Sequence, residues 1–179
     1  MLLDNYLRNL PWVLPVFLVG LGILVLAAPR VQQRTGLSRR LFVAFGLAAV
    51  GFAALVATPS HGTLKAKDAG TFDAEIRVPA PRDLYAFTEL GLNIWMTVPL
   101  GFLALLVTRR LRRGWPLLVA FAVPLSCELL QWAFPQMNRV GFQLSDLLAN
   151  WVGVVVGLGV AALFAVAHDR SRAGESAAA

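Results

Sequence analysis

Five long apolar runs, separated by short charged segments, constrain the fold of this chain more than any other feature. They cover residues 11–28, 41–58, 92–108, 116–134 and 146–167. Each run is about as long as a helix that crosses the roughly 30 Å apolar core of a bilayer. Because lipid offers no hydrogen bonds to the backbone, such a run must form an α-helix there. We therefore predict an all-α, polytopic transmembrane bundle with five spans.

Domain boundaries follow from the same runs. We expect a single transmembrane domain over residues 1–168 and a disordered cytoplasmic tail over residues 169–179, which are polar and rich in Ala and Ser. The first run also resembles a signal peptide, because Leu26, Ala27 and Ala28 imitate a cleavage site. We interpret it as a retained helix, since its length is nearer to a span and Pro29 would follow the cut directly.

Composition supports the membrane class and excludes others. The chain is 58% hydrophobic, has a mean hydropathy of +0.66 and carries only 15% charged residues. Its net charge of +6 lies in clusters between the runs, so it indicates topology and not a nucleic-acid partner. Cys127 is the one cysteine, which excludes an internal disulfide, and the two histidines, His61 and His168, are far apart. We predict no cofactor and no metal site.

The arginine clusters predict the orientation in the cell (plasma) membrane. Residues 30–40, residues 109–113 and the tail with Arg170 and Arg172 fall on one side if all five runs cross. The positive-inside rule makes that side cytoplasmic. We therefore expect the N-terminus outside, the C-terminus in the cytoplasm, and residues 60–90 outside.

The polar segment between the second and third runs contains two stretches with weak patterns. Residues 72–78 alternate weakly between apolar and polar, which predicts a short strand or an extended stretch. Residues 82–90 have a helical pattern, and we expect that helix to lie at the membrane interface or to extend the next span.

Charged side chains inside the apolar runs point to a functional site. Glu128 lies within the fourth run and Asp146 opens the fifth. An ionisable residue in a span is costly, so it indicates function by default. On helical geometry Glu128 and Gln131 share one face, and Asp146 and Asn150 share another. With the orientation above, these residues and Asn93 meet toward the outer side of the membrane.

We therefore predict a polar ligand-binding site toward the outside of the membrane. Its candidate residues are Asn93, Glu128, Gln131, Arg139, Asp146 and Asn150. Arg139 is the nearest counter-charge to Glu128 in the sequence. Asn93, Asp146 and Asn150 also have a structural interpretation in place of ligand binding. They stand near helix starts, where Asn and Asp side chains cap free backbone N–H groups. We assign no catalytic residue.

Small residues and a proline predict how the last three helices pack. Gly153 and Gly157 form a small-xxx-small pair on the face of Asp146, and Gly101 lies on the face of Asn93. Pro99 cannot donate a hydrogen bond to the carbonyl group four residues back, so we expect a kink in the third helix. We predict that these four residues form helix contacts.

The same residues resemble a known family. The pattern Asn93-x5-Pro99-Leu-Gly101-Phe, Glu128-x2-Gln131, Arg139 and Asp146-x3-Asn150-x2-Gly153-x3-Gly157 is similar to that of the VanZ-like family. The resemblance covers the third span to the fifth and implies a small integral membrane protein. The founding member is linked to low-level resistance to the glycopeptide teicoplanin, and the resemblance implies no established reaction.

The chain departs from the family pattern at the start of the fifth span. Family members often carry D-x-D-D-x3-N there, whereas this sequence has Gln143 and Ser145 in the first two acidic positions. Arg139 also stands about one residue further upstream than is usual. A mechanism that needs two carboxylates at this helix start is therefore placed in doubt, although Glu128 and Asp146 can pair across helices.

Three kinds of function fit these observations. The first is a binding protein whose partners are membrane lipids, a lipid-linked cell-wall precursor or a lipophilic glycopeptide. The second is a membrane-embedded enzyme that acts on a lipid-linked substrate, with Glu128 as general base. Neither Ser126, Ser145 nor Cys127 has a histidine partner in sequence reach, which disfavours the enzyme. The third is a small transporter, which the absence of a visible internal repeat disfavours.

Overall fold

Five long helices make up almost the whole structure. The computed structural model describes residues 10–59, 70–78, 80–85, 88–137 and 141–178. The long helices are α2 (Val13–Thr35), α3 (Arg39–Ala57), α5 (Glu89–Leu111), α6 (Trp115–Ala133) and α7 (Leu144–Ala178). All five are long and apolar enough to cross a membrane. The predicted all-α, five-span fold class is confirmed.

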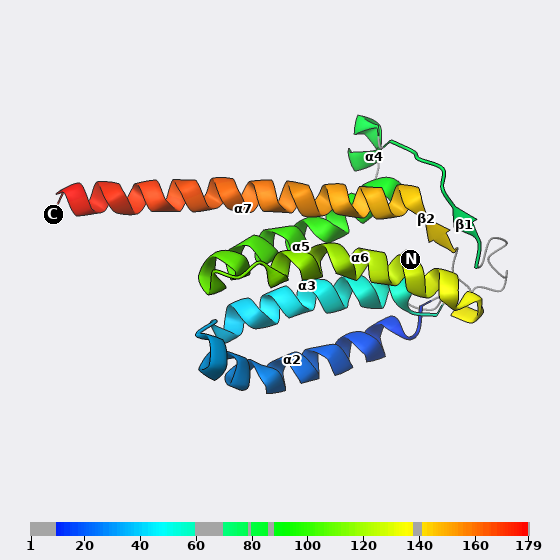
Figure 1. The fold of residues 1–179 in the computed structure, drawn as a ribbon, viewed down its shortest axis with the longest axis horizontal. Helices are drawn as coiled ribbons and strands as arrows, with labels where there is room; N and C mark the ends of the chain where they lie inside the picture. Colours follow the sequence, from blue (N-terminus) through cyan, green and yellow to red (C-terminus); the bar gives the residue numbers. More distant parts are fainter. Residues whose placement is uncertain (1–9, 60–69, 79, 86–87, 138–140, 179) are drawn as a thin grey trace.

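The helices lie roughly along one common direction, so the bundle has two ends. Figure 1 shows α7 along one side and α2 along the other, with α5, α6 and α3 between them. The turns from α2 to α3 and from α5 to α6 lie at one end, which we call the arginine end. The starts of α5 and α7 lie at the other end, with the short elements that connect the spans.

Local sequence signals explain where the helices begin and end. Ser38 caps α3 by accepting a hydrogen bond from the Leu41 N–H at 3.3 Å, and Thr88 caps α5 in the same way through the Gly91 N–H at 3.4 Å. Helix α2 ends at Gly36, whose φ of 70° is the left-handed conformation that glycine adopts without strain. The helix thus continues beyond the predicted end at residue 28 and includes Pro29.

Helices α5 and α7 form the closest contact in the bundle. A Cβ atom on Gly101 would overlap the Val154 carbonyl group, and one on Gly153 would overlap the Ile94 carbonyl group. Gly157 is equally close to the α5 backbone. The backbones of the two helices approach to this extent because none of the three residues has a side chain. Pro99 differs from them, because it lies inside α5 but faces outward and is exposed.

The apolar core lies between α5, α7, α6 and α3. Its fully buried side chains include Leu100, Ala104, Val107 and Val154. By contrast, α2 buries little and exposes large apolar residues such as Leu18, as expected of a helix that faces lipid.

Short elements close the other end of the bundle. They are α4 (Pro81–Tyr85), the 3-10 helix η1 (Pro135–Met137), β1 (Phe72–Asp73) and β2 (Phe142–Gln143). The strands pair in parallel, with Phe72 opposite Phe142 and Asp73 opposite Gln143, and the two phenylalanine rings stack at 4.8 Å. After β1 the chain runs past the start of α7 to α4 (Figure 1).

Two predicted segments differ in detail from the structure. Of residues 72–78, for which a short strand or an extended stretch is predicted, only the first two form a strand, because β2 offers only two partners. The helical pattern of residues 82–90 divides between α4 and the first turn of α5, which Thr88 caps.

The last helix also continues beyond the predicted span. The sequence predicts a disordered tail at residues 169–179, whereas α7 is helical to Ala178. Four Ala, two Arg and one Glu stand among residues 169–179, and these residue types are strong helix formers, which accounts for the continuation.

Candidate functional site

A polar cavity lies at the end of the bundle opposite the arginine end. It has a volume of about 340 Å³ and receives side chains from the last turns of α3 and α6 and the first turns of α5 and α7. We call it the acidic cavity. Its lining residues are Leu55, Val56, Glu89, Leu92, Asn93, Met96, Glu128, Gln131, Gln143 and Asp146.

Glu128 is the most deeply placed carboxylate of the cavity. Its side chain is only 3% exposed, and its Oε2 atom accepts a hydrogen bond from the Gln143 backbone N–H at 3.1 Å. This donor comes from β2, directly before α7, so the strand lies against Glu128. A buried carboxylate requires such partners, because burial without them is costly.

Asp146 faces side chains from α5. The Asn93 side-chain amide forms a hydrogen bond with its carboxylate, and Glu89 is close enough to interact with it electrostatically. Glu89 interacts with Glu128 in the same way. The cavity thus brings three carboxylates, from three helices, around one space.

Gln131 ties the cavity to α3. Its Nε2 atom donates a hydrogen bond to the Val56 carbonyl oxygen at 2.8 Å, which leaves its own side-chain oxygen as an acceptor. Leu55 and Val56 complete the wall on this side. Helix α3 therefore contributes to the site, although its sequence carries no polar residue that predicts such a role.

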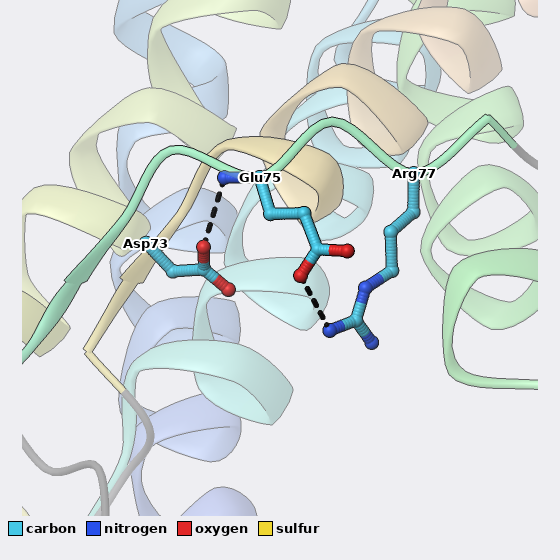
Figure 2. A network of polar contacts seen from close by, with 3 residues as sticks. All are labelled: Asp73, Glu75 and Arg77. Atoms are coloured by element: carbon cyan, nitrogen blue, oxygen red, sulfur yellow. Dashed lines mark hydrogen bonds and ion pairs between the residues drawn. The ribbon is translucent and has the colours of Figure 1, made fainter.

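The charge of the described lining is entirely negative. Glu89, Glu128 and Asp146 are its charged members, and none of the described lining residues is Lys, Arg or His. Asp146 does interact with Arg77 on the segment after β1. Arg77, however, pairs with Glu75 at 2.9 Å, and both side chains are largely exposed (Figure 2). Its pairing with Glu75 raises the pKa of Arg77.

The segment that carries Arg77 is held by its own acidic residues. The Asp73 carboxylate accepts a hydrogen bond from the Glu75 N–H at 2.8 Å, as Figure 2 shows. Asp73 follows Phe72 in β1, so this turn connects the strand pair to Arg77. The arginine is thus oriented toward Glu75 and lies outside the lining of the cavity.

Four of the six predicted ligand-binding residues meet in this cavity. They are Asn93, Glu128, Gln131 and Asp146. Arg139 lies outside the described residues. Asn150 does not line the cavity, because it lies one turn after Asp146 along α7 and is only 1% exposed. Its backbone carbonyl oxygen accepts a hydrogen bond from the Thr97 hydroxyl at 2.7 Å. Its side-chain oxygen is buried without a hydrogen-bond partner among the described residues.

Two polar lining residues were not predicted. Glu89 belongs to the predicted helical stretch 82–90, outside the apolar runs, and Gln143 replaces an acidic residue of the family pattern. The sequence does contain a signal for Glu89, because this residue stands four positions before Asn93 and therefore shares its helix face.

Among the described residues no group of three His, Cys, Asp or Glu side chains could hold a metal ion.

Comparison with known proteins identifies a family for the chain. A family model described as VanZ/LLP1 matches residues 12–165 of the chain. This match includes the first two spans as well as the pattern between Asn93 and Gly157. No curated protein and no solved structure matches the chain.

Proposed function

The chain belongs to the VanZ/LLP1 family of membrane proteins, and from this premise we propose that it binds an amphiphilic molecule of the cell envelope. The ligand is a membrane lipid, a lipid-linked cell-wall precursor or a lipophilic glycopeptide, whose headgroup enters the acidic cavity. The observation that carries the proposal is the convergence of Asn93, Glu128, Gln131 and Asp146 on one cavity within a bundle of apolar helices.

The charge of the lining supports a headgroup that carries an amine. Three carboxylates can each accept charge-assisted hydrogen bonds, and no described lining residue offers a counter-charge. An ammonium group in the cavity would reduce the repulsion between Glu89, Glu128 and Asp146. The side-chain oxygen of Gln131 adds a neutral acceptor.

The apolar part of such a ligand fits the surroundings of the cavity. Leu55, Leu92 and Met96 contribute apolar surface to the same space. Leu92 is 42% exposed, so the rim is apolar where a lipid chain would pass into the bilayer. An amphiphile therefore matches the site better than a small polar solute does.

In the proposed orientation, the acidic cavity opens toward the outside of the plasma membrane. The arginine clusters at the opposite end support this assignment through the positive-inside rule. Envelope precursors and glycopeptides are accessible on that side, so the protein would act in envelope function or glycopeptide resistance.

Binding is favoured over catalysis by the chemistry of the lining. The described lining residues include no hydroxyl, thiol, imidazole or amine side chain that would serve as a nucleophile. Glu128 would be the general base of an enzyme at this site, and its present partner is the Gln143 N–H.

The test removes charge from the cavity and keeps the shape of each side chain. Glu128→Gln and Asp146→Asn are expressed in a teicoplanin-susceptible host, with Glu75→Gln as control because Glu75 is an exposed carboxylate outside the cavity. We expect both cavity variants to lose any teicoplanin protection that the wild type confers, at unchanged membrane abundance. Protection that survives both substitutions, or that falls only with abundance, contradicts the proposal.

A further inference from the structure

A second polar pocket lies at the arginine end of the bundle. It has a volume of about 150 Å³ and is formed where the end of α2 meets the turn from α5 to α6. Its lining residues are Arg34, Thr35, Leu111, Arg113 and Trp115. None of them is acidic, so this pocket has the opposite charge to the acidic cavity.

The two arginines of this pocket share a lining that contains no acidic residue in the described part of the chain. Neither Arg34 nor Arg113 takes part in an ion pair among the described residues. Other arginines at this end do have partners: Arg109 pairs with Asp169 at 2.9 Å, and Arg39 donates a hydrogen bond to Gln32 at 2.7 Å. Two like charges on one small pocket repel each other, and a bound anion would remove that repulsion.

The start of α6 adds to the positive potential of the pocket. Gly114 caps this helix without a side-chain hydrogen bond, and its first turn contains no acidic residue. The positive end of the helix dipole is therefore not neutralised by a carboxylate of its own first turn. Because Trp115 is both the first residue of α6 and part of the pocket lining, this helix end lies at the pocket.

The surroundings indicate that the anion belongs to a lipid. Trp115 is 41% exposed and packs edge-on against Phe45, in the manner of an aromatic residue at a membrane interface. Leu118, one turn further along α6, is 72% exposed. Apolar surface thus begins directly beside the pocket, where it is available to an acyl chain.

We propose that this pocket binds the phosphate headgroup of an anionic phospholipid, with Arg34 and Arg113 as its ligands. Arginine suits this role because its guanidinium group donates two parallel hydrogen bonds to phosphate oxygens. The site is separate from the acidic cavity, at the other end of the bundle, and goes beyond the function proposed above.

The experiment measures binding of a fluorescent phosphatidylglycerol to the full chain in detergent by anisotropy. The test variant is R34Q together with R113Q. The control is R30Q together with R110Q, which removes the same charge from neighbouring exposed positions outside the pocket. We expect the test pair to weaken binding about 30-fold and the control pair to weaken it less than about threefold.

Three results would overturn the proposal. The first is an equal loss in both double variants, which would indicate a general effect of charge. The second is equal binding of phosphatidylcholine by the wild type. The third is binding of inorganic phosphate alone as tight as that of phosphatidylglycerol, which would show that no lipid is required.

The wild-type protein gives a second measurement that depends on no variant. Raising the salt concentration from about 0.05 M to about 0.5 M should weaken binding of phosphatidylglycerol severalfold, because exposed charges are screened. Binding that does not change with salt would show that the arginines do not hold the headgroup, and the proposal would fail.

Discussion

The acidic cavity and the second pocket, which we call the arginine pocket after Arg34 and Arg113, lie at opposite ends of one bundle and carry opposite charges. Helix α5 alone spans the distance between them, about 33 Å from Glu89 to Leu111. Of the acidic groups, Glu128 is buried and held by a hydrogen bond from the β2 backbone. At the other end, Arg34 is exposed in the last turn of α2, and Arg113 is exposed in the turn from α5 to α6. The position of the acidic side chains thus depends on contacts between helices. The position of the arginines depends mainly on where the helices end.

This difference predicts that substitutions near the acidic cavity cost more stability than similar substitutions at the arginine end. The cavity requires α3, α5, α6 and α7 to meet in a fixed arrangement. The arginine pocket requires only that the end of α2 meets the turn from α5 to α6. The variants below test this contrast.

The largest effect is expected at the contact between α5 and α7. Gly153→Ala places a methyl group against the Ile94 carbonyl and the Thr97 hydroxyl, where α7 packs on α5. We expect a loss of about 1–3 kcal/mol in the free energy of unfolding, as for other overpacked sites. The thermal unfolding midpoint in detergent measures it.

The matched control for that variant is Gly159→Ala on the same helix. Nothing lies within 4 Å of a Cβ atom at Gly159, so the substitution should leave the midpoint unchanged or raise it slightly. Equal losses in both variants would mean that the contact between α5 and α7 does not hold the cavity end together.

The next effect separates the structural role of Glu128 from its charge. Glu128→Leu leaves the Gln143 N–H without its acceptor, which should cost about 1–3 kcal/mol of stability. Glu128→Gln keeps an acceptor and should cost less. Chemical denaturation in detergent compares the two. Similar losses would show that the hydrogen bond from Gln143 contributes little.

A smaller loss of stability is expected when a glutamine is replaced at either end of the bundle. Gln131→Leu removes the bond to the Val56 carbonyl oxygen and should cost about 0.5–1.5 kcal/mol. Gln32→Leu removes the exposed bond from Arg39 and should change stability by less than about 0.5 kcal/mol. If Gln32→Leu proves the more costly of the two, the contrast between the ends is wrong.

The smallest effect belongs to the exposed ion pair at the arginine end. Arg109→Gln breaks the 2.9 Å contact with Asp169, and both side chains are about half exposed or more, at 47% and 63%. Exposed pairs contribute about 0–1 kcal/mol. A double-mutant cycle with Asp169→Asn measures the pair directly, and a coupling well above this range would show that the arginine end is more ordered than we infer.

Much of the fold follows from the sequence for a simple physical reason. Lipid admits few structures, so the five apolar runs predict the five helices. The helix ends are less predictable. Helix α2 passes through Pro29 to Thr35, and α7 continues to Ala178, because local helix propensity persists beyond the apolar residues.

The site was predictable only in part. Glu128, Gln131, Asp146 and Asn93 were found because polar residues in apolar runs are conspicuous. Leu55 and Val56 of α3 were not, since helix periodicity does not indicate which helices become neighbours. The parallel pairing of β1 with β2, which places Gln143 at Glu128, joins segments about 70 residues apart and has no local signal.

The most direct test of the central claim compares two probes that differ only at the amine. Dodecylamine and N-acetyldodecylamine are titrated by calorimetry into the wild type, Asp146→Asn and Glu75→Gln in detergent. We predict that the wild type and Glu75→Gln bind the amine at least about tenfold more tightly than the amide, and that Asp146→Asn loses this preference. Equal affinity of the wild type for both probes would contradict the claim that the acidic cavity recognises a cationic headgroup.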